Sequence, residues 1–178
     1  MTQERRHLQD GTESRAVYSD CDTYRYDLAR VWAPEGPRLC YVMLNPSTAS
    51  ETRNDPTVAR CERRARALGY GGFRVVNIFA FRATDPKVLM QAADPVGPDG
   101  DAYLLRAADW ADRVIAAWGV HGAHRGRGAE VAALLRQSGK PLFHLGLSRD
   151  GHPRHPLYIG YGVRPVAWAS DGALTGAD

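Results

Sequence analysis

Four short apolar runs, each of which leads into polar residues, constrain the fold of this chain more than any other feature. They are RLCYVML (38–44), FRVVNIFAF (73–81), DRVIAAWG (112–119) and PLFHLGL (141–147). Segments with a helical spacing of apolar residues separate them, at 55–68, 83–92, 101–111 and 126–139. Such alternation predicts right-handed crossovers between parallel strands that are buried on both faces. We therefore expect an α/β fold, a three-layer α/β/α sandwich whose central sheet is mostly parallel and has about four strands.

The two ends of the chain depart from this pattern. TYRYDLARVW (23–32) has aromatic and apolar residues at nearly two-residue spacing, which predicts an N-terminal strand or hairpin beside the sheet. Residues 1–15 and 169–178 are mostly polar, and we expect both to be flexible tails. The 178 residues suit a single domain, which we assign to 16–168.

The composition permits a nucleic-acid partner without requiring one. Apolar residues make up 44% of the chain, enough for a core, and the net charge is +3. The three cysteines form no CxxC pair, which argues against a zinc ribbon or an iron–sulfur cluster and fits a reducing cytoplasm. We see no signal peptide, and no stretch approaches the roughly 18 apolar residues of a membrane span. We expect a cytoplasmic protein without a metal, a cofactor or a membrane partner.

Amide and imidazole side chains lie near the ends of the predicted strands. Asn45 follows the first run, Asn77 lies inside the second, and two histidines, His152 and His155, follow the fourth. In open α/β sheets the carboxyl ends of the strands form the ligand-binding edge. Each residue also has a structural interpretation: Asn45 as a turn residue, Asn77 as a buried amide that ties down a loop, and the histidines as solvated residues. An amide that faces a pocket can match the edge of a nucleobase.

Two other segments allow both kinds of interpretation. HGAHRGRG (121–128) contains Arg125 and Arg127, which either bind a phosphate or belong to an exposed flexible loop. Asp55, before Pro56, either assists catalysis or caps the helix that follows. The chain lacks the GxSxG, GxxxxGK(S/T) and HExxH motifs, which excludes the enzyme classes that those motifs define.

A longer series of motifs carries two resemblances. In order, the motifs are YRYDLARVW, MLNPSTA, NDPT, GYGG, VVNIFAFRATDP, WG and GHPRHPLY. Through them the chain resembles, over residues 16–168, a bacterial domain-of-unknown-function family, family 1643, which by itself implies no activity. Their order also resembles the uracil-DNA glycosylase superfamily. VMLNPS stands where that superfamily has its water-positioning motif, VVNIFAF is similar to its base-reading strand, AAWG to its LLWG strand, and GHPRHPLY to its catalytic-histidine loop.

The second resemblance implies a role for each matching residue. Asn45 would hold the attacking water, and Asn77 would read the Watson–Crick edge of the flipped base. His152 or His155 would stabilise the oxygen of the departing base, and His155 is favoured because it keeps a His-Pro step beside the apolar wedge. The candidates for the aromatic residue that stacks on the base are Tyr70, Phe79 and Phe81.

The same resemblance implies contacts with the DNA strand. Leu157 or Tyr158 would fill the gap that the flipped base leaves in the stack. The residues that would contact phosphates are Ser47, Arg125, Arg127 and Arg154. The chain departs from the superfamily pattern at Leu44 and Ser47, and its last motif is one residue longer than usual.

The implied function is that of a monofunctional DNA glycosylase. Such an enzyme flips a natural or a modified base out of DNA and hydrolyses its N-glycosidic bond, in DNA repair or in antiviral defence against modified phage DNA. We expect a monomer that acts on DNA through a short, salt-sensitive footprint, because the net charge is only +3. The alternatives are a non-catalytic nucleic-acid or nucleotide-binding module, and a nucleoside or nucleotide hydrolase.

Overall fold

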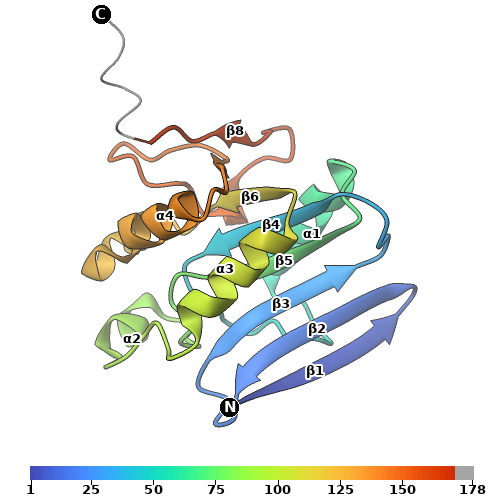
Figure 1. Ribbon diagram of the computed structural model, residues 1–178, viewed down its shortest axis with the longest axis horizontal. Helices are drawn as coiled ribbons and strands as arrows, with labels where there is room; N and C mark the ends of the chain where they lie inside the picture. Colours follow the sequence, from blue (N-terminus) through green and yellow to red (C-terminus); the bar gives the residue numbers. More distant parts are fainter. Residues whose placement is uncertain (171–178) are drawn as a thin grey trace, which may run out of the picture.

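The computed structural model describes residues 1–170, which form one mixed sheet of eight strands in the order β1-β2-β3-β5-β4-β6-β7-β8, with helices around it (Figure 1). The strands are β1 (Thr2–Gln9), β2 (Thr12–Ser19), β3 (Arg25–Val31), β4 (Arg38–Met43), β5 (Gly72–Asn77), β6 (Arg113–Ala116), β7 (Leu142–His144) and β8 (Val166–Ala167). The helices are α1 (Pro56–Ala67), α2 (Pro86–Gln91), α3 (Gly100–Trp110) and α4 (Arg127–Gln137), with 3-10 helices η1 (Val120–Gly126) and η2 (Pro156–Tyr158).

The sheet contradicts the expected sandwich with a mostly parallel, four-stranded centre like that of uracil-DNA glycosylases. Four of the seven strand pairings are antiparallel, namely β1–β2, β2–β3, β3–β5 and β7–β8. The three parallel pairings join β5, β4, β6 and β7. These four strands come from the four apolar runs, because burial on both faces leaves a continuous apolar signal. Of the added antiparallel strands, β1, β2 and β3 carry charged residues and β8 has only two residues, so none gives such a signal.

The N-terminal residues form a β-hairpin, so the flexible tail expected for residues 1–15 is wrong. β1 and β2 pair along their whole length. Asp10 and Gly11 form the turn between them, with φ angles of 51° and 77°. An Asp-Gly pair favours a two-residue hairpin turn because both central residues need a positive φ. Of the second expected tail, residues 171–178 lie outside the described part of the chain.

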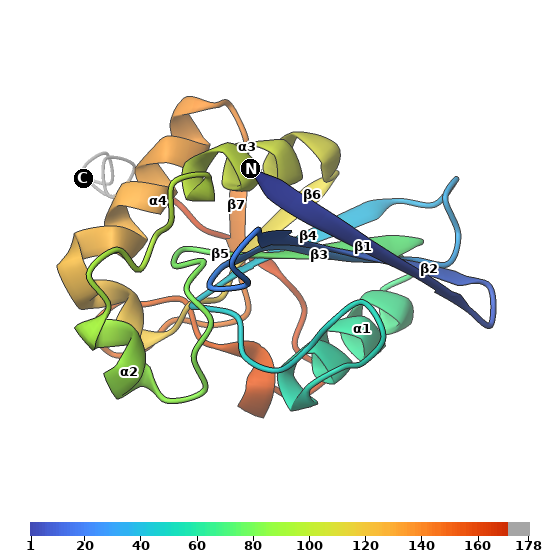
Figure 2. The same cartoon turned by 90° about the horizontal axis from the view of Figure 1, so that it is seen from below.

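Helices cover both faces of the sheet, as the edge-on view shows (Figure 2). On one face, here the α1 face, α1 packs over a core cluster that includes Tyr41, Cys61 and Phe73. On the other, here the α3–α4 face, α3 and α4 pack over a cluster that includes Leu104 and Leu135. Removing such side chains from water stabilises the fold by about 25 cal/mol per Å² of apolar surface. The two clusters therefore hold the helices to the central strands.

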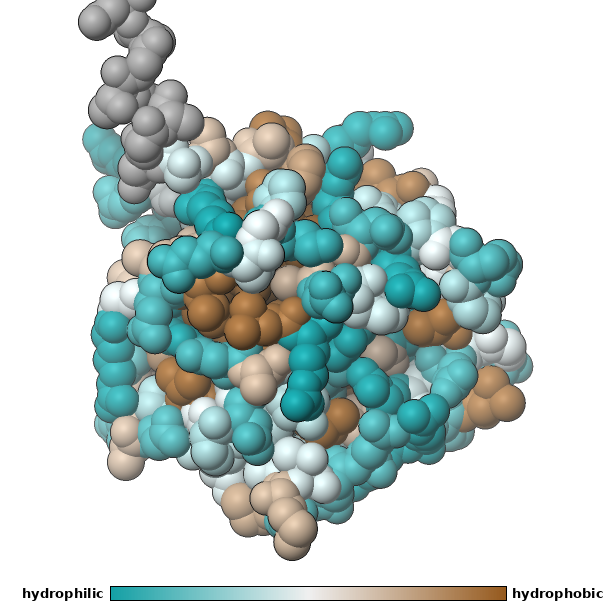
Figure 3. All heavy atoms as spheres, in the orientation of Figure 1, coloured by the Kyte–Doolittle hydropathy of each residue, from teal (hydrophilic) through white to brown (hydrophobic). Residues whose placement is uncertain are grey.

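The outer surface on the α3–α4 side is mostly hydrophilic, and its apolar residues form small separate patches (Figure 3). Within residues 1–170, no helix is both long enough and apolar enough to cross a membrane.

A β-bulge at Tyr26 turns Arg25 toward the α1 face. Val17 of β2 lies opposite Asp27, but the next residue, Tyr18, lies opposite Arg25, so β3 holds one extra residue at Tyr26. The ring of Tyr26 stacks on an aromatic ring of α3, with 5.2 Å between centroids, and the Asp27 carboxylate lies on that same face. Regular alternation would have put Arg25 on the α3–α4 face together with Asp27. The bulge therefore separates these two charges.

Asp27 is a buried carboxylate that holds β2, β3 and β5 together. Its exposed fraction is 1%, and it forms ion pairs with Arg74 of β5 and, at 2.6 Å, with Arg15 of β2. The Arg74 guanidinium also lies 5.5 Å from the ring centroid of Trp110 in α3. Removing one partner of a buried ion pair leaves the other as an uncompensated buried charge.

We expect Asp27→Asn to lower the free energy of unfolding by about 3–5 kcal/mol, because it removes the negative charge that compensates buried Arg74. The matched control is Asp22→Asn, whose carboxylate pairs with Arg5 at 2.9 Å while both side chains are well exposed. Such an exposed pair contributes less than about 1 kcal/mol. Urea unfolding followed by circular dichroism measures both variants, and equal effects would contradict the assignment.

Candidate functional site

A cavity of about 530 Å³ lies at the carboxyl ends of β4 and β6. β4 pairs with β5 on one side and β6 on the other, and the chain leaves β4 toward α1 but leaves β6 toward α4 on the opposite face. Ligands of open α/β sheets bind at such a change of direction. The loop after β4, the first turn of α1 and the η2 segment meet here (Figure 2). Polar lining residues include Arg25, Asn45, Ser47, Asp55, His121 and His155.

The Asn45 amide is held in one orientation by backbone carbonyls. Its Nδ2 donates to the carbonyls of Ala83 at 2.7 Å and Pro46 at 3.1 Å, with that of Phe81 at 3.5 Å. Only the N–H side of an amide can face carbonyl oxygens, so the orientation is fixed. Within residues 1–170, Oδ1 makes no hydrogen bond, which leaves it as an acceptor for a ligand or a water.

The His155 ring is held as a neutral imidazole with a donor at Nε2. The backbone N–H of Leu157 donates to Nδ1 at 3.4 Å, so Nδ1 is the acceptor and the ring proton resides on Nε2. Burial lowers the pKa of His155 below its ordinary value of 6.5, and the nearby Asp55 opposes this only in part. The ring is therefore uncharged at neutral pH, and its Nε2–H is available to a ligand in the cavity.

Arg25 lines the cavity as a buried cation without a carboxylate partner. Its exposed fraction is 2%, and it forms no ion pair within residues 1–170. Its Nη1 donates to the carbonyl of Ala49 at 2.9 Å, while its Nε is buried and has no partner among those residues. Burial lowers the pKa of Arg25 to about 10, which still leaves it charged at neutral pH.

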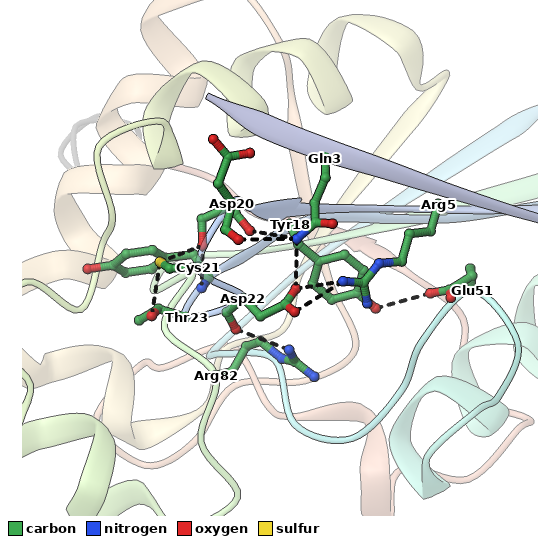
Figure 4. Close-up of polar contacts among 11 residues, drawn as sticks. Gln3, Arg5, Tyr18, Asp20, Cys21, Asp22, Thr23, Glu51 and Arg82 are labelled. Atoms are coloured by element: carbon green, nitrogen blue, oxygen red, sulfur yellow. Dashed lines mark hydrogen bonds and ion pairs between the residues drawn. The ribbon is translucent and has the colours of Figure 1, made fainter.

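Two further arginines flank the ring of Tyr18, which lies opposite Arg25 in the sheet (Figure 4). The guanidinium carbons of Arg5 and Arg82 lie 4.5 and 5.1 Å from the centroid of that ring. The Tyr18 hydroxyl donates to Glu51 at 3.2 Å. Arg82 forms no ion pair in the described part of the chain, and its positive charge helps to lower the pKa of Arg25. Arg82 therefore adds a positive charge next to the cavity, whereas the charge of Arg5 is paired with Asp22.

Asp55 caps α1 from inside the cavity lining. Its Oδ1 accepts from the backbone N–H of Val58 at 2.9 Å, and its Oδ2 from that of Ala49 at 3.3 Å. This confirms the helix-cap interpretation of Asp55. Both carboxylate oxygens are already hydrogen-bonded, so the main role of Asp55 is to fix the loop after β4. This loop carries Asn45, and its Ala49 carbonyl accepts the hydrogen bond from Arg25.

Asn77 is buried beside the cavity rather than in its lining. It ends β5 in register with Met43, whose side chain packs on the α1 face. Its exposed fraction is 5%, and neither amide atom has a hydrogen-bond partner within residues 1–170. Leaving such a group unpaired costs about 1–3 kcal/mol. The amide that the sequence places inside a strand thus lies at the end of β5, and within residues 1–170 it is a buried polar group without a hydrogen-bond partner.

The aromatic candidates for base stacking lie outside the cavity lining. Phe79 is fully buried in the cluster under α3 and α4. Tyr70 follows α1 near the amino end of β5, where its carbonyl accepts from the indole of Trp32. Phe81 packs edge-on against Tyr24 and contributes only its carbonyl beside Asn45. The contiguous run VVNIFAF does not reveal which of its side chains turn toward the α1 face.

His152 and the three arginine candidates lie outside the cavity that His155 lines. His152 lines a different cavity, of about 850 Å³, formed with α4 and Trp168. Arg127 is buried in ion pairs with Asp101 at 2.6 Å and Glu130 at 3.1 Å. Arg125 donates to backbone carbonyls after α2. Arg154 is exposed. The expected phosphate contact therefore has no support at Arg127.

Ser47 and Leu157 line the cavity with Asn45 and His155, as the motif order suggests. The Ser47 hydroxyl lies 3.1 Å from that of Thr84, which links the loop after β4 to the start of α2. Tyr158, next to Leu157, has an exposed fraction of 89%. Its ring is free to contact a partner at the rim.

Arg25 is the lining residue that sequence reasoning missed. The signal was an arginine between two tyrosines in a predicted strand, but the bulge that sets its face leaves no pattern in the sequence. The described residues contain no group of three or more His, Cys, Asp or Glu side chains placed to hold a metal ion.

We expect Asn45→Asp to lower the free energy of unfolding by about 1–3 kcal/mol, because the aspartate loses the donors to Ala83 and Pro46. Asn54→Asp is the matched control, since a carboxylate keeps the bond that the Asn54 oxygen accepts from Arg30 at 3.0 Å and loses only the exposed hydrogen bond from Nδ2 to Glu62 at 3.4 Å. Urea unfolding from pH 7 to pH 4 measures both. The deficit of Asn45→Asp should shrink at low pH, where protonation restores one donor, and a deficit independent of pH would contradict the assignment.

Comparison with known proteins gives one match. The model of a family described as protein of unknown function (DUF1643) matches residues 25–157. Neither a curated protein nor a solved structure matches the chain, and none of these comparisons links it to the uracil-DNA glycosylases. Because the match spans well over half of the sequence, the chain belongs to the DUF1643 family.

Proposed function

We propose that this protein hydrolyses the N-glycosidic bond of a nucleotide in DNA, after the base has turned out of the helix into the cavity. One observation carries the proposal. The Asn45 amide and the His155 ring line the same cavity, and backbone contacts fix one as an acceptor and the other as a donor. An acceptor for water and a donor for the leaving base are the two groups that this hydrolysis needs.

The reaction replaces the bond from C1′ to the base nitrogen with a bond from C1′ to a water oxygen. Asn45 Oδ1 accepts a hydrogen bond from the water and so directs its oxygen toward C1′. An amide is too weak a base to remove a proton from the water. The activation free energy must therefore be lowered mainly by stabilising the departing base. The sugar gains the hydroxyl of the water, and the base gains its proton.

His155 supplies that stabilisation in the proposed reaction. Negative charge develops on a carbonyl oxygen of the base as the bond breaks, and the Nε2–H can donate to it. A neutral donor in a site of low polarity is effective because little solvent competes with it. Burial, which lowers the pKa of His155, keeps the ring in this form.

Exposed side chains around the cavity support DNA as the substrate. Tyr158 and Val120 have exposed fractions of 89% and 55%, and Val120 belongs to the lining. Extruding a base costs a few kcal/mol, which an inserted side chain at the rim can offset. Arg82, without an ion pair among residues 1–170, adds positive charge next to the loop that starts at Ala83.

A second candidate is hydrolysis of a free nucleotide in the same cavity. Arg25 favours it, because a buried guanidinium that has no carboxylate partner among residues 1–170 suits the phosphate of a small ligand. The two candidates share Asn45 and His155 and differ in what else enters the cavity.

The test is incubation of the protein with oligonucleotides that carry a panel of natural and modified bases, together with viral genomic DNA and free deoxynucleotides. Mass spectrometry detects released base, and alkaline cleavage detects abasic sites. We expect base release from at least one DNA substrate and none with Asn45→Ala, which should still bind DNA. Release from free nucleotides at the same rate would favour the second candidate, and no release from any substrate would overturn both.

His152→Ala is the matched control for this test, because His152 lines the other cavity. It should keep the parent rate of base release. A loss of release with His152→Ala but not with His155→Ala would contradict the assignment of the donor.

We expect His155→Asn to slow base release by about 10²-fold or more, because asparagine can replace Nδ1 but leaves no donor at Nε2. His155→Gln should retain more activity, since its amide nitrogen reaches the Nε2 position. In the parent protein the rate should stay constant from pH 8 to pH 7, because burial lowers the pKa of His155 below its ordinary value of 6.5 and the ring stays neutral there. At lower pH the rate should fall, because protonation of Nδ1 removes the acceptor for the Leu157 N–H that orients the ring. Equal rates for the two variants in single-turnover assays would contradict a donor role.

A further inference from the structure

We propose that the cavity contains a subsite for a terminal anionic group, a phosphomonoester or a carboxylate, centred on the guanidinium of Arg25. The subsite deepens the proposed function, on which it rests only for the identity of the substrate, because binding of an anion can be measured without catalysis.

The free edge of Arg25 is the first argument. Its Nη1 is fixed to the carbonyl of Ala49, so the group cannot rotate freely. The opposite edge, made by Nε and Nη2, has no hydrogen-bond partner within residues 1–170, and Nε is sealed from solvent. This edge is the planar fork that binds the two oxygens of a carboxylate or phosphate. A ligand that reaches Arg25 through the cavity first meets the unused donor at Nη2, and it pairs with Nε only if it enters deeply enough to displace the side chains that seal that atom.

The charges around Arg25 are the second argument. Burial lowers the pKa of Arg25 more than the charge of Asp55, the acidic group on the lining, raises it. Asp55 already accepts from two backbone amides and forms no ion pair with Arg25. Arg82 has the same sign as Arg25 and also lacks an ion pair in the described part of the chain. A buried cation is costly unless it is paired, so the fold leaves a positive charge that an incoming anion can neutralise.

The first turn of α1 adds a donor in the same cavity. The lining includes Pro56 and Thr57 at the start of this helix. Asp55 occupies the N–H of Val58, whereas that of Thr57 has no partner within residues 1–170. A free N–H at a helix N-terminus favours an anion.

A comparison within the same strand shows that Arg25 is not simply a structural arginine. Arg30, also in β3 and also buried on the α1 face, donates to the carbonyls of Ser50 at 2.6 Å and Arg53 at 3.2 Å, and to the side chain of Asn54 at 3.0 Å. Arg30 thus fixes the loop after β4 and lies outside this cavity lining. Within residues 1–170, Arg30 makes four side-chain hydrogen bonds and leaves Nη1 without a partner, whereas Arg25 makes one and leaves both Nε and Nη2 without a partner.

The burial of Arg25 limits what the anion can be. A phosphodiester continues as a strand in both directions and cannot enter the depth of a cavity where the guanidinium is 2% exposed. A terminal group can, which leaves two sources: the phosphomonoester of a free nucleotide, or an acidic substituent on a base that has been turned out of DNA.

Isothermal titration calorimetry of the full chain with inorganic phosphate and with deoxycytidine 5′-monophosphate tests the subsite. We expect both to bind, the nucleotide at least tenfold more tightly than deoxycytidine. Arg25→Met should lose this preference, and Arg25→Lys, which keeps the charge without the fork, should weaken it. Arg30→Met is the matched control and should bind as the parent does, although its melting temperature falls.

Thermal unfolding in phosphate-free buffer keeps the test decisive if a variant binds poorly for other reasons. Removing an unpaired buried charge should leave the melting temperature of Arg25→Met equal to or above that of the parent, and phosphate should raise the melting temperature of the parent only. Failure of phosphate and nucleotide to bind the parent, or unchanged binding by Arg25→Met, would overturn the subsite. Anion binding without base release from any substrate would overturn the proposed function and leave the subsite standing.

Two further arms distinguish the sources of the anion. Preference for the monophosphate over the nucleoside identifies a phosphomonoester. Preference for an oligonucleotide with 5-carboxycytosine over the same oligonucleotide with cytosine identifies an acidic base. Either preference must disappear in Arg25→Met, and its persistence there would contradict the role of Arg25.

Discussion

The bulge at Tyr26 decides on which face of the sheet Arg25 lies, and the candidate site depends on that choice. Without the extra residue, Arg25 would share the α3–α4 face with Asp27 and the two charges could pair. With it, Asp27 stays with Arg74 and Arg15 on that face, while Arg25 enters the cavity on the other. One inserted residue thus separates a structural ion pair from an unpaired cation.

An unpaired buried arginine lowers the stability of the free protein, and the rest of the fold must offset that cost. The core clusters on both faces of the sheet do so, together with the Asp27 ion pairs and the anchoring of the loop after β4 by Arg30. Asn77, another buried polar group without a partner in the described part of the chain, lies on the same face as Arg25. Polar groups that a fold leaves unpaired are typical of sites that bind a ligand, because the ligand supplies the missing partner.

The sequence predicts the parts of this structure that have a periodic or local signal. The four apolar runs yield the parallel strands, and Asp55 before a proline yields the cap of α1. The Asp10-Gly11 pair was a clear hairpin signal, but β1 concealed it, because this strand is polar on both faces and Leu8 is its one apolar residue. The order of the motifs predicted that Asn45, Ser47, His155 and Leu157 lie together, and all four line one cavity. The same order also suggested Phe79, Tyr70 and Arg127, which lie outside that cavity. The side of the sheet on which Arg25 lies depends on the bulge at Tyr26, and only three-dimensional packing determines where that bulge forms.

The central claim is that one ligand engages Arg25 and His155 in one cavity. The most direct measurement is two-dimensional NMR of the arginine Nε–H and histidine ring signals while deoxycytidine 5′-monophosphate is added to the full chain. The account predicts that the signals of Arg25 and His155 shift with a single Kd, while those of Arg30 and His152 stay in place. Shifts confined to Arg30 or His152, or different Kd values for Arg25 and His155, would contradict it.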